Sequence, residues 1–136
     1  MPTMTFPARF EFLDEIREFV AEIAREGGFN DREVYSLQLA ADEAATNIIE
    51  HAYEGSLDAD FDVSCEMDDD TFVITMRDTG KPFNPSNVRL PDLKADLSER
   101  KIGGLGVYLM RKLMDEVHYI SNPRTGNLLT MTKRRG

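Results

Sequence analysis

Glu43 and Asn47 combine residue types that move protons and bind metals on a segment that otherwise looks buried. They lie four residues apart in the run DEAATNIIEHAY, where apolar residues recur at spacings of three and four. This spacing is typical of an amphipathic helix, so the two side chains project from one face, one turn apart. The carboxylate can accept a proton and the carboxamide can ligate a hard metal ion. Taken alone, such a pair is also compatible with a solvated helix face. His51 continues the same spacing, and we interpret it as structural.

Asp78 closes a run in which apolar residues alternate with polar ones, and it shares the parity of Ile74 and Met76. The pattern therefore places its carboxylate on the buried face of a strand. An unpaired charge is unfavourable there, so a ligand or a neighbouring donor must satisfy it. Gly80 follows closely and would let a flat ring approach the backbone.

A second glycine-containing stretch, Ile102 to Val107, precedes a run typical of a helix. Glycines at a helix start expose backbone N–H groups at the positive end of the helix dipole, which suits phosphate oxygens. Residues 82–102 match no regular element and contain several prolines. A loop of this length inside a compact domain is uncommon and is usually functional or disordered. We interpret it as a lid over a nucleotide, the alternative being an ordinary surface loop.

The rest of the chain predicts the elements that would position these residues. Helical spacing from Leu13 to Ala24 predicts a first helix that ends at Gly27-Gly28, and Asn30 or Asp31 would cap the second. A third helix would place Leu105, Leu109 and Leu113 on one side, with Met110 and Met114 on its flank. Alternation predicts strands over residues 61–67, 72–78, 116–121 and 128–133, and a short edge strand within residues 3–10. We therefore expect an α+β fold, a two-layer sandwich of an antiparallel-rich mixed sheet with about three helices on one face.

Length, charge and cysteine content limit the class of protein. The 136 residues correspond to one domain. With 25 Asp and Glu against 16 Lys and Arg, the net charge of −9 disfavours nucleic acid and anionic membranes, whereas a metal ion could still shield a bound nucleotide. Cys65 is the only cysteine, and no apolar run reaches the length of a membrane span. These features predict a cytoplasmic protein with no membrane contact.

Three segments considered together resemble a known family: DEAATNIIEHAY, DTGKPFNP and ERKIGGLGVYLMRKLMDEVHY. Their order and distances resemble the N, G1 and G2 boxes of the Bergerat-type (GHKL) ATPases. With the later GNLLTMTK, they look more narrowly like the stand-alone anti-sigma-factor serine/threonine kinases of bacteria. The resemblance covers about Phe6 to Lys133 and implies one histidine-kinase-like ATPase domain over residues 1–136, with the Bergerat ATP-binding fold and an ATP lid at 82–102.

The resemblance also implies ATP and Mg²⁺ as ligands and assigns roles to individual residues. Asp78 would accept the adenine amine, Gly80 would leave room for the ring, Asn47 would ligate Mg²⁺ and Glu43 would be the general base. Phosphate contacts would come from the second glycine stretch, namely Gly103, Gly104, Leu105 and Gly106.

The adenine end departs from the family pattern at one position. Asn127 stands where many relatives of the wider superfamily have a threonine after the hairpin glycine. Asparagine can also form hydrogen bonds, so the resemblance implies that Asn127 completes the adenine site, with Thr130 as the alternative. Arg100 and Lys101 could contact phosphate or be solvated.

The implied function is an anti-sigma factor that binds a sigma factor and phosphorylates an anti-sigma-factor antagonist protein. A homodimer is compatible with the edge strand near the N-terminus. The alternative is a nucleotide-gated binding module that sequesters a partner without phosphoryl transfer, although such a module has no need of a base at Glu43. ATP hydrolysis coupled to dimer closure would require a transducer domain, for which this chain has no room.

Overall fold

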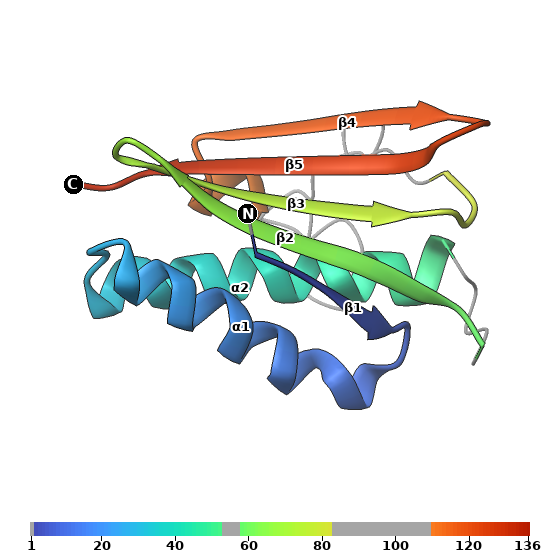
Figure 1. Ribbon diagram of the computed structural model, residues 1–136, viewed down its shortest axis with the longest axis horizontal. Coiled ribbons are helices and arrows are strands. Elements are labelled where there is room, and N and C mark those ends of the chain that lie inside the picture. Colours follow the sequence, from blue (N-terminus) through green and yellow to red (C-terminus); the bar gives the residue numbers. More distant parts are fainter. Residues whose placement is uncertain (1, 53–57, 83–109) are drawn as a thin grey trace, which may run out of the picture.

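The computed structural model describes residues 2–52, 58–82 and 110–136, which form a two-layer sandwich (Figure 1). A five-stranded sheet forms one layer, and the helices α1 and α2 lie along one of its faces. The strands are β1 (Thr3–Pro7), β2 (Asp60–Asp68), β3 (Thr71–Asp78), β4 (Glu116–Asn122) and β5 (Gly126–Arg134). The helical elements are a 3₁₀ turn (Phe10–Phe12), α1 (Leu13–Glu26), α2 (Asp31–Asn47) and a π-helical turn (Ile48–Ala52). The predicted α+β sandwich is confirmed.

The sheet has the order β1-β2-β3-β5-β4, and its four described pairings are antiparallel. Within the described residues, the parallel pairing implied by a mixed sheet is not found. β3 occupies the centre, and its residues alternate between buried and partly exposed up to a buried Asp78. The register places Asn127 of β5 opposite both Asp78 of β3 and Ser121 of β4.

The two described long helices begin and end where the sequence predicts. α1 buries Ile16, Val20 and Ala24 and is followed by Gly27 and by Gly28, whose φ of 87° favours glycine. α2 begins with a capping box, in which the Asn30 side chain accepts from the Glu33 amide and the Glu33 carboxylate accepts from the Asn30 amide. Asn30, rather than Asp31, is therefore the cap.

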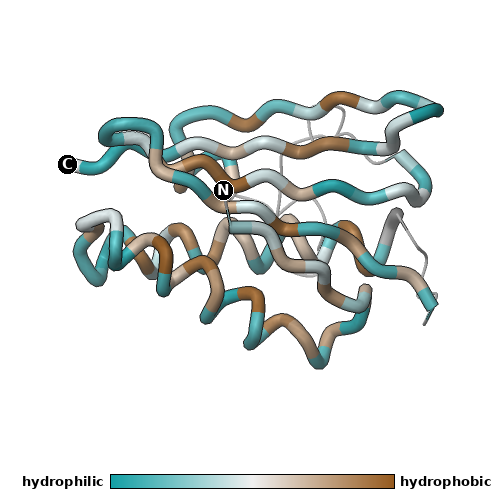
Figure 2. Tube along the Cα trace, viewed as in Figure 1, coloured by the Kyte–Doolittle hydropathy of each residue, from teal (hydrophilic) through white to brown (hydrophobic). Residues whose placement is uncertain are grey.

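The core lies between the helices and the sheet. Small side chains line the buried face of α2, which lets the helix approach the strands closely. Phe29, just before α2, packs edge-to-face on Phe72 of β3 with ring centroids 5.7 Å apart. Hydrophobic residues are concentrated along α1 and in the middle of the strands, whereas the turns and the C-terminal end are hydrophilic (Figure 2).

Two predicted helices differ in detail from the structure. The α-helical part of α2 ends at Asn47 and continues as the π-helical turn, and the predicted end near Gly55 lies outside the described residues. Of the third helix, the structure describes the end, residues 110–113. There Met110 and Met114 are 0% and 4% exposed while Leu113 is only partly buried, so the predicted flank is the buried side. Flexible methionine side chains fill this part of the core.

Residues 83–109, which hold most of the predicted lid and the second glycine stretch, lie outside the described residues. Over the part that is described, none of the helices combines the length and the apolar character needed to span a membrane.

Gly126 and Gly27 give a matched test of the fold. Gly126 begins β5 with a φ of 93°, and a Cβ there would lie 2.5 Å from the Asp78 carbonyl oxygen. A Cβ at Gly27 would meet the flexible side chain of Met67 at ordinary backbone angles. We expect Gly126→Ala to lower the free energy of unfolding by about 1–3 kcal/mol, and Gly27→Ala to lower it less. Urea unfolding of both variants measures this, and equal losses would contradict it.

Candidate functional site

Asp78, the last residue of β3, is buried with 6% of its surface exposed. Its Oδ1 accepts hydrogen bonds from Asn127 Nδ2 at 2.8 Å and from the Gly80 amide at 3.0 Å. In the part of the chain that the structure describes, both donors to Asp78 act on this one oxygen. Oδ2 therefore keeps its capacity to accept a further donor, such as an amine of a ligand.

Asn127 is held in a single orientation by its partners. Its Nδ2 also donates to the Gly80 carbonyl oxygen at 3.0 Å, and its Oδ1 accepts from the Ser121 hydroxyl at 2.8 Å. Thr130 has the opposite parity in β5, where Asn127, Leu129 and Met131 are the buried residues. Asn127 is thus the β5 residue that contacts Asp78, and Thr130 lies on the other face of the sheet.

Ser121 was not identified from the sequence. It extends the hydrogen-bond chain from the buried carboxylate to the edge strand β4. In the structure residues 123–125 close the β4–β5 hairpin, and this register places Ser121 opposite Asn127. A turn over residues 123–126 would shift the pairing by one residue, so the sequence did not reveal this contact.

Burial raises the pKa of the Asp78 carboxyl above its ordinary value, while the hydrogen bonds from Asn127 and Gly80 lower it in part. The group remains a good acceptor but is poorly solvated. An added donor on Oδ2 would stabilise its charged form.

Glu43 and Asn47 lie one turn apart near the C-terminal end of α2. Asn47 is 5% exposed, and its Nδ2 has no hydrogen-bond partner among the described residues. A buried amide nitrogen left without an acceptor is uncommon and indicates that an acceptor from a ligand completes its bonding. The π-helical turn begins at the next residue, and such turns frequently occur at functional sites.

Glu43 is partly buried, and its pKa is raised first by burial and then by the charges of Asp42 and Glu50. Asp42 in turn forms an ion pair with Arg17 of α1. The sequence analysis did not identify this pair, because nothing in the helical pattern shows which residues of α1 and α2 meet. A carboxylate whose pKa is raised toward neutral pH is suited to accept a proton.

α2 packs against β3, so the polar groups of α2 and Asp78 lie on elements in contact. Gly103, Gly104, Leu105 and Gly106, together with Arg100, Lys101 and the His51 side chain, lie outside the described residues. Their predicted roles stay predictions.

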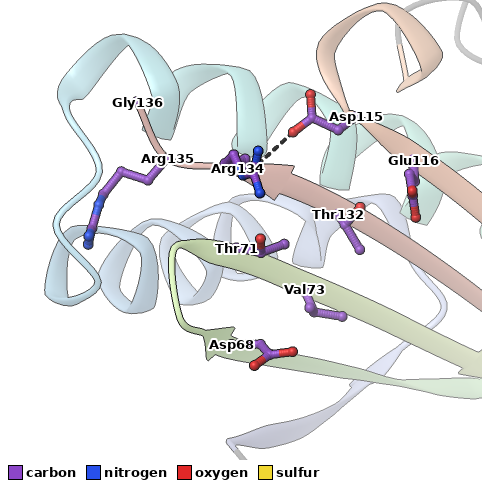
Figure 3. Close-up of a pocket in the computed structure, with 9 residues that line it drawn as sticks. All are labelled: Asp68, Thr71, Val73, Asp115, Glu116, Thr132, Arg134, Arg135 and Gly136. Carbon is purple, nitrogen blue, oxygen red and sulfur yellow. Dashed lines mark hydrogen bonds between the residues drawn. The ribbon is translucent and has the colours of Figure 1, made fainter.

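A groove of about 600 Å³ lies elsewhere, on the sheet face opposite the helices (Figure 3). It is bordered by Thr71, Val73 and Thr132, with Asp115 accepting from the Arg134 amide at 2.6 Å. None of the predicted site residues lines it. We therefore do not assign the nucleotide to it.

The raised pKa of Asp78 predicts a pH dependence of stability. The unfolded carboxyl titrates near pH ~4, and its folded pKa is higher. The stabilising contribution of the protonated group is therefore complete below pH ~4 and is lost as the pH rises through the folded pKa. Relative to the wild type, Asp78→Asn should gain in free energy of unfolding between about pH 4 and pH 7. Urea unfolding across this range measures the difference, and a flat or falling difference would contradict the assignment.

Comparison with known proteins assigns the chain to a family. Residues 6–133 match the histidine kinase-like ATPase domain. The chain is 31% identical to the serine-protein kinase RsbW of Halalkalibacterium halodurans over 96% of this chain and 80% of the relative. It is 33% identical to RsbW of Bacillus pumilus over 96% of this chain and 83% of the relative.

Solved structures agree on the fold. The RsbU and RsbW domains of a Mycobacterium tuberculosis protein match with a TM-score of 0.64 at 16% identity, covering 99% of this chain and 33% of that one. A histidine kinase domain from Erythrobacter litoralis matches with a TM-score of 0.54 at 15% identity, covering 96% of this chain and 62% of that one. The resemblance drawn from the three sequence segments is thereby confirmed. The chain belongs to the histidine kinase-like ATPase domain family, together with the serine-protein kinases RsbW.

Proposed function

We propose that this chain transfers the γ-phosphate of ATP to a serine or threonine of an anti-sigma-factor antagonist protein, and that it binds a sigma factor in the cytoplasm. The observation that carries the phosphoryl transfer is Glu43, a partly buried carboxylate with a raised pKa, one helical turn from the unpartnered carboxamide of Asn47. The partners are proposed from the relatives named RsbW.

The adenine ring would lie against the end of β3. Asp78 Oδ2 would accept the exocyclic amine, while Asn127 and the Gly80 amide hold Oδ1 and fix the plane of the carboxylate. Such a charge-assisted hydrogen bond contributes ~1.5–3 kcal/mol. Gly80 would leave room for the ring.

The Asn47 carboxamide would provide the protein ligand for Mg²⁺. The described residues contain no group of three or more acidic, histidine or cysteine side chains arranged for a metal. A magnesium ion at Asn47 would therefore take most of its oxygen ligands from phosphates and water, as this ion commonly does. Bound there, Mg²⁺ would neutralise charge that develops on the phosphates.

Glu43 would act as the general base. The acceptor hydroxyl oxygen attacks the γ-phosphorus, its proton passes to the Glu43 carboxylate, and ADP leaves with the bonding electron pair. We further propose that residues 82–102 form the lid of a single domain over 1–136, and that Gly103, Gly104, Leu105 and Gly106 contact the phosphates.

The second candidate function is a nucleotide-gated module that binds its partner without phosphoryl transfer. Such a module would need the adenine and metal contacts but no base, so Glu43 separates the two proposals. Incubation with labelled ATP, Mg²⁺, and candidate antagonist and sigma-factor proteins from the same organism distinguishes them. Label on the antagonist supports the kinase, whereas ATP-dependent binding of the sigma factor without label supports the module.

Asp78→Asn should weaken ATP binding by about tenfold or more, because an amide is a weaker acceptor than a carboxylate. Asn127→Ala should also weaken it, since Asp78 loses a donor that orients it. Thr130→Val, on the opposite face of β5, is the matched control and should leave the affinity unchanged. Calorimetry measures all three, and unchanged affinity in Asp78→Asn would remove this residue from the site.

Glu43→Gln should lower the rate of phosphoryl transfer by ~10²–10⁴ while preserving ATP affinity, because the amide keeps the shape but cannot accept the proton. Glu66→Gln, on β2, is the control and should transfer at the parental rate. Quench-flow with labelled ATP gives the rate and calorimetry gives the affinity. Parental transfer by Glu43→Gln would show that another group is the base.

A further inference from the structure

Three polar side chains form a row across the sheet, from the central strand β3 through β5 to β4. The register sets Asn127 opposite both Asp78 and Ser121. Directly opposed residues of antiparallel strands project from the same face of a sheet. Asp78 is 6% exposed and Asn127 is 3% exposed, whereas Ser121 is an exposed residue. The row therefore leads from the core to solvent.

Each hydrogen bond in this row has a defined direction. Ser121 Oγ donates to Asn127 Oδ1 at 2.8 Å. Asn127 Nδ2 donates to Asp78 Oδ1 at 2.8 Å and to the Gly80 carbonyl oxygen at 3.0 Å. Both hydrogens of the Asn127 amide group are thus in use, and the Ser121 hydroxyl supplies the donor to its oxygen.

Loss of the Ser121 hydroxyl would weaken the hold of Asn127 on Asp78. Nδ2 would keep its two acceptors, but Oδ1 would lose its donor on a residue that is almost fully buried, which is unfavourable. Hydrogen bonds in series also polarise one another, so an amide that accepts at its oxygen donates more strongly through its nitrogen. With a weaker donor, the Asp78 carboxylate would turn more freely and gain a proton more readily.

Charged side chains do not replace these neutral donors at Asp78. Among the described residues, burial raises the pKa of its carboxyl, the bonds from Asn127 and Gly80 lower it, and no charged side chain contributes. Arg77 and Lys81, the nearest charged residues in the sequence, are exposed. The ionised form of Asp78 therefore depends on the donors that the row provides.

We propose that Ser121 is a positioning residue that gives the Asp78 site its preference for a base with an exocyclic amine over a base with a carbonyl in that place. An ionised Oδ2 held in one plane accepts from an amine and repels a carbonyl oxygen. A carboxylate that turns or gains a proton discriminates less, because a protonated oxygen can donate to a carbonyl. The inference rests on the proposed binding of adenine at Asp78.

The probes are ATP and inosine triphosphate, which carries a carbonyl where ATP has its exocyclic amine. Calorimetry with the full chain gives the affinity for each nucleotide in the wild type, Ser121→Ala and Ser121→Thr. Threonine retains the hydroxyl and is well suited to a strand. Ser36→Ala is the matched control, because it removes a hydroxyl that donates to the Arg32 carbonyl oxygen within α2.

Ser121→Ala should bind ATP about two- to tenfold more weakly. It should lose less affinity for inosine triphosphate, so the ratio of the two affinities falls. Ser121→Thr should restore this ratio, and Ser36→Ala should keep it. A purely structural role of Ser121 would lower the free energy of unfolding without moving the ratio. The proposal is overturned if Ser121→Ala keeps the wild-type ratio, if Ser36→Ala lowers it equally, or if Ser121→Thr fails to restore it.

A second readout needs no nucleotide. The side-chain carboxyl carbon resonance of Asp78 is followed by NMR against pH in the same proteins. We expect its titration midpoint to lie higher in Ser121→Ala than in the wild type, because the charged form loses stabilisation. Ser121→Thr should match the wild type.

The two readouts separate this inference from the proposed function. Absence of ATP binding by the wild type would refute the proposed function and, with it, the base preference. ATP binding by the wild type, with a midpoint that does not move in Ser121→Ala, would overturn this inference alone.

Discussion

The burial of one carboxylate constrains the whole end of the sheet around Asp78. Removing Asp78 from water is unfavourable unless donors replace the lost hydration, and the fold provides two on the same oxygen. The Asn127 amide can reach it because β5 pairs with β3 in the register that sets these residues opposite each other. Gly126 must precede Asn127, since a side chain there would collide with the Asp78 carbonyl. The strand order, the pairing register and the turn at Gly126 are therefore all needed for the hydrogen bond between Asn127 and Asp78.

Burial raises the pKa of both Asp78 and Glu43, but the neighbouring groups of the two carboxylates act in opposite directions. Both have raised pKa values with burial as the largest cause, yet hydrogen bonds partly offset the effect at Asp78, whereas the neighbouring charges at Glu43 add to it. Asp78 is thereby kept as a fixed acceptor with one oxygen left for a ligand. Glu43 is left closer to gaining a proton, and the Arg17–Asp42 pair beside it ties its helix to α1. Under the proposed function Asp78 binds the base and Glu43 accepts the proton, and these two roles require such different surroundings.

Much of this arrangement could be predicted from the sequence, because the spacing of apolar residues shows which face of a strand or helix is buried. The alternation of β3 placed Asp78 in the core, and helical spacing placed Glu43 beside Asn47. Contacts between distant segments were out of reach, since neither the choice of Asn127 over Thr130 nor the Arg17–Asp42 pair follows from local pattern. The π-helical turn after Asn47 was missed because its residues fit an α-helix equally well. For the third helix the spacing did not show which side is buried, and in the described part Met110 and Met114 are buried.

Ser121 gives the buried site a connection to the rim of the sheet. Its hydroxyl donates to Asn127, which donates to Asp78, so every donor in the series has a fixed direction. Without that hydroxyl, Asn127 Oδ1 would lose the Ser121 donor, while Nδ2 would keep its contacts with Asp78 and Gly80. A substitution on this edge strand would therefore act on the buried carboxylate through Asn127, without any change at Asp78 itself.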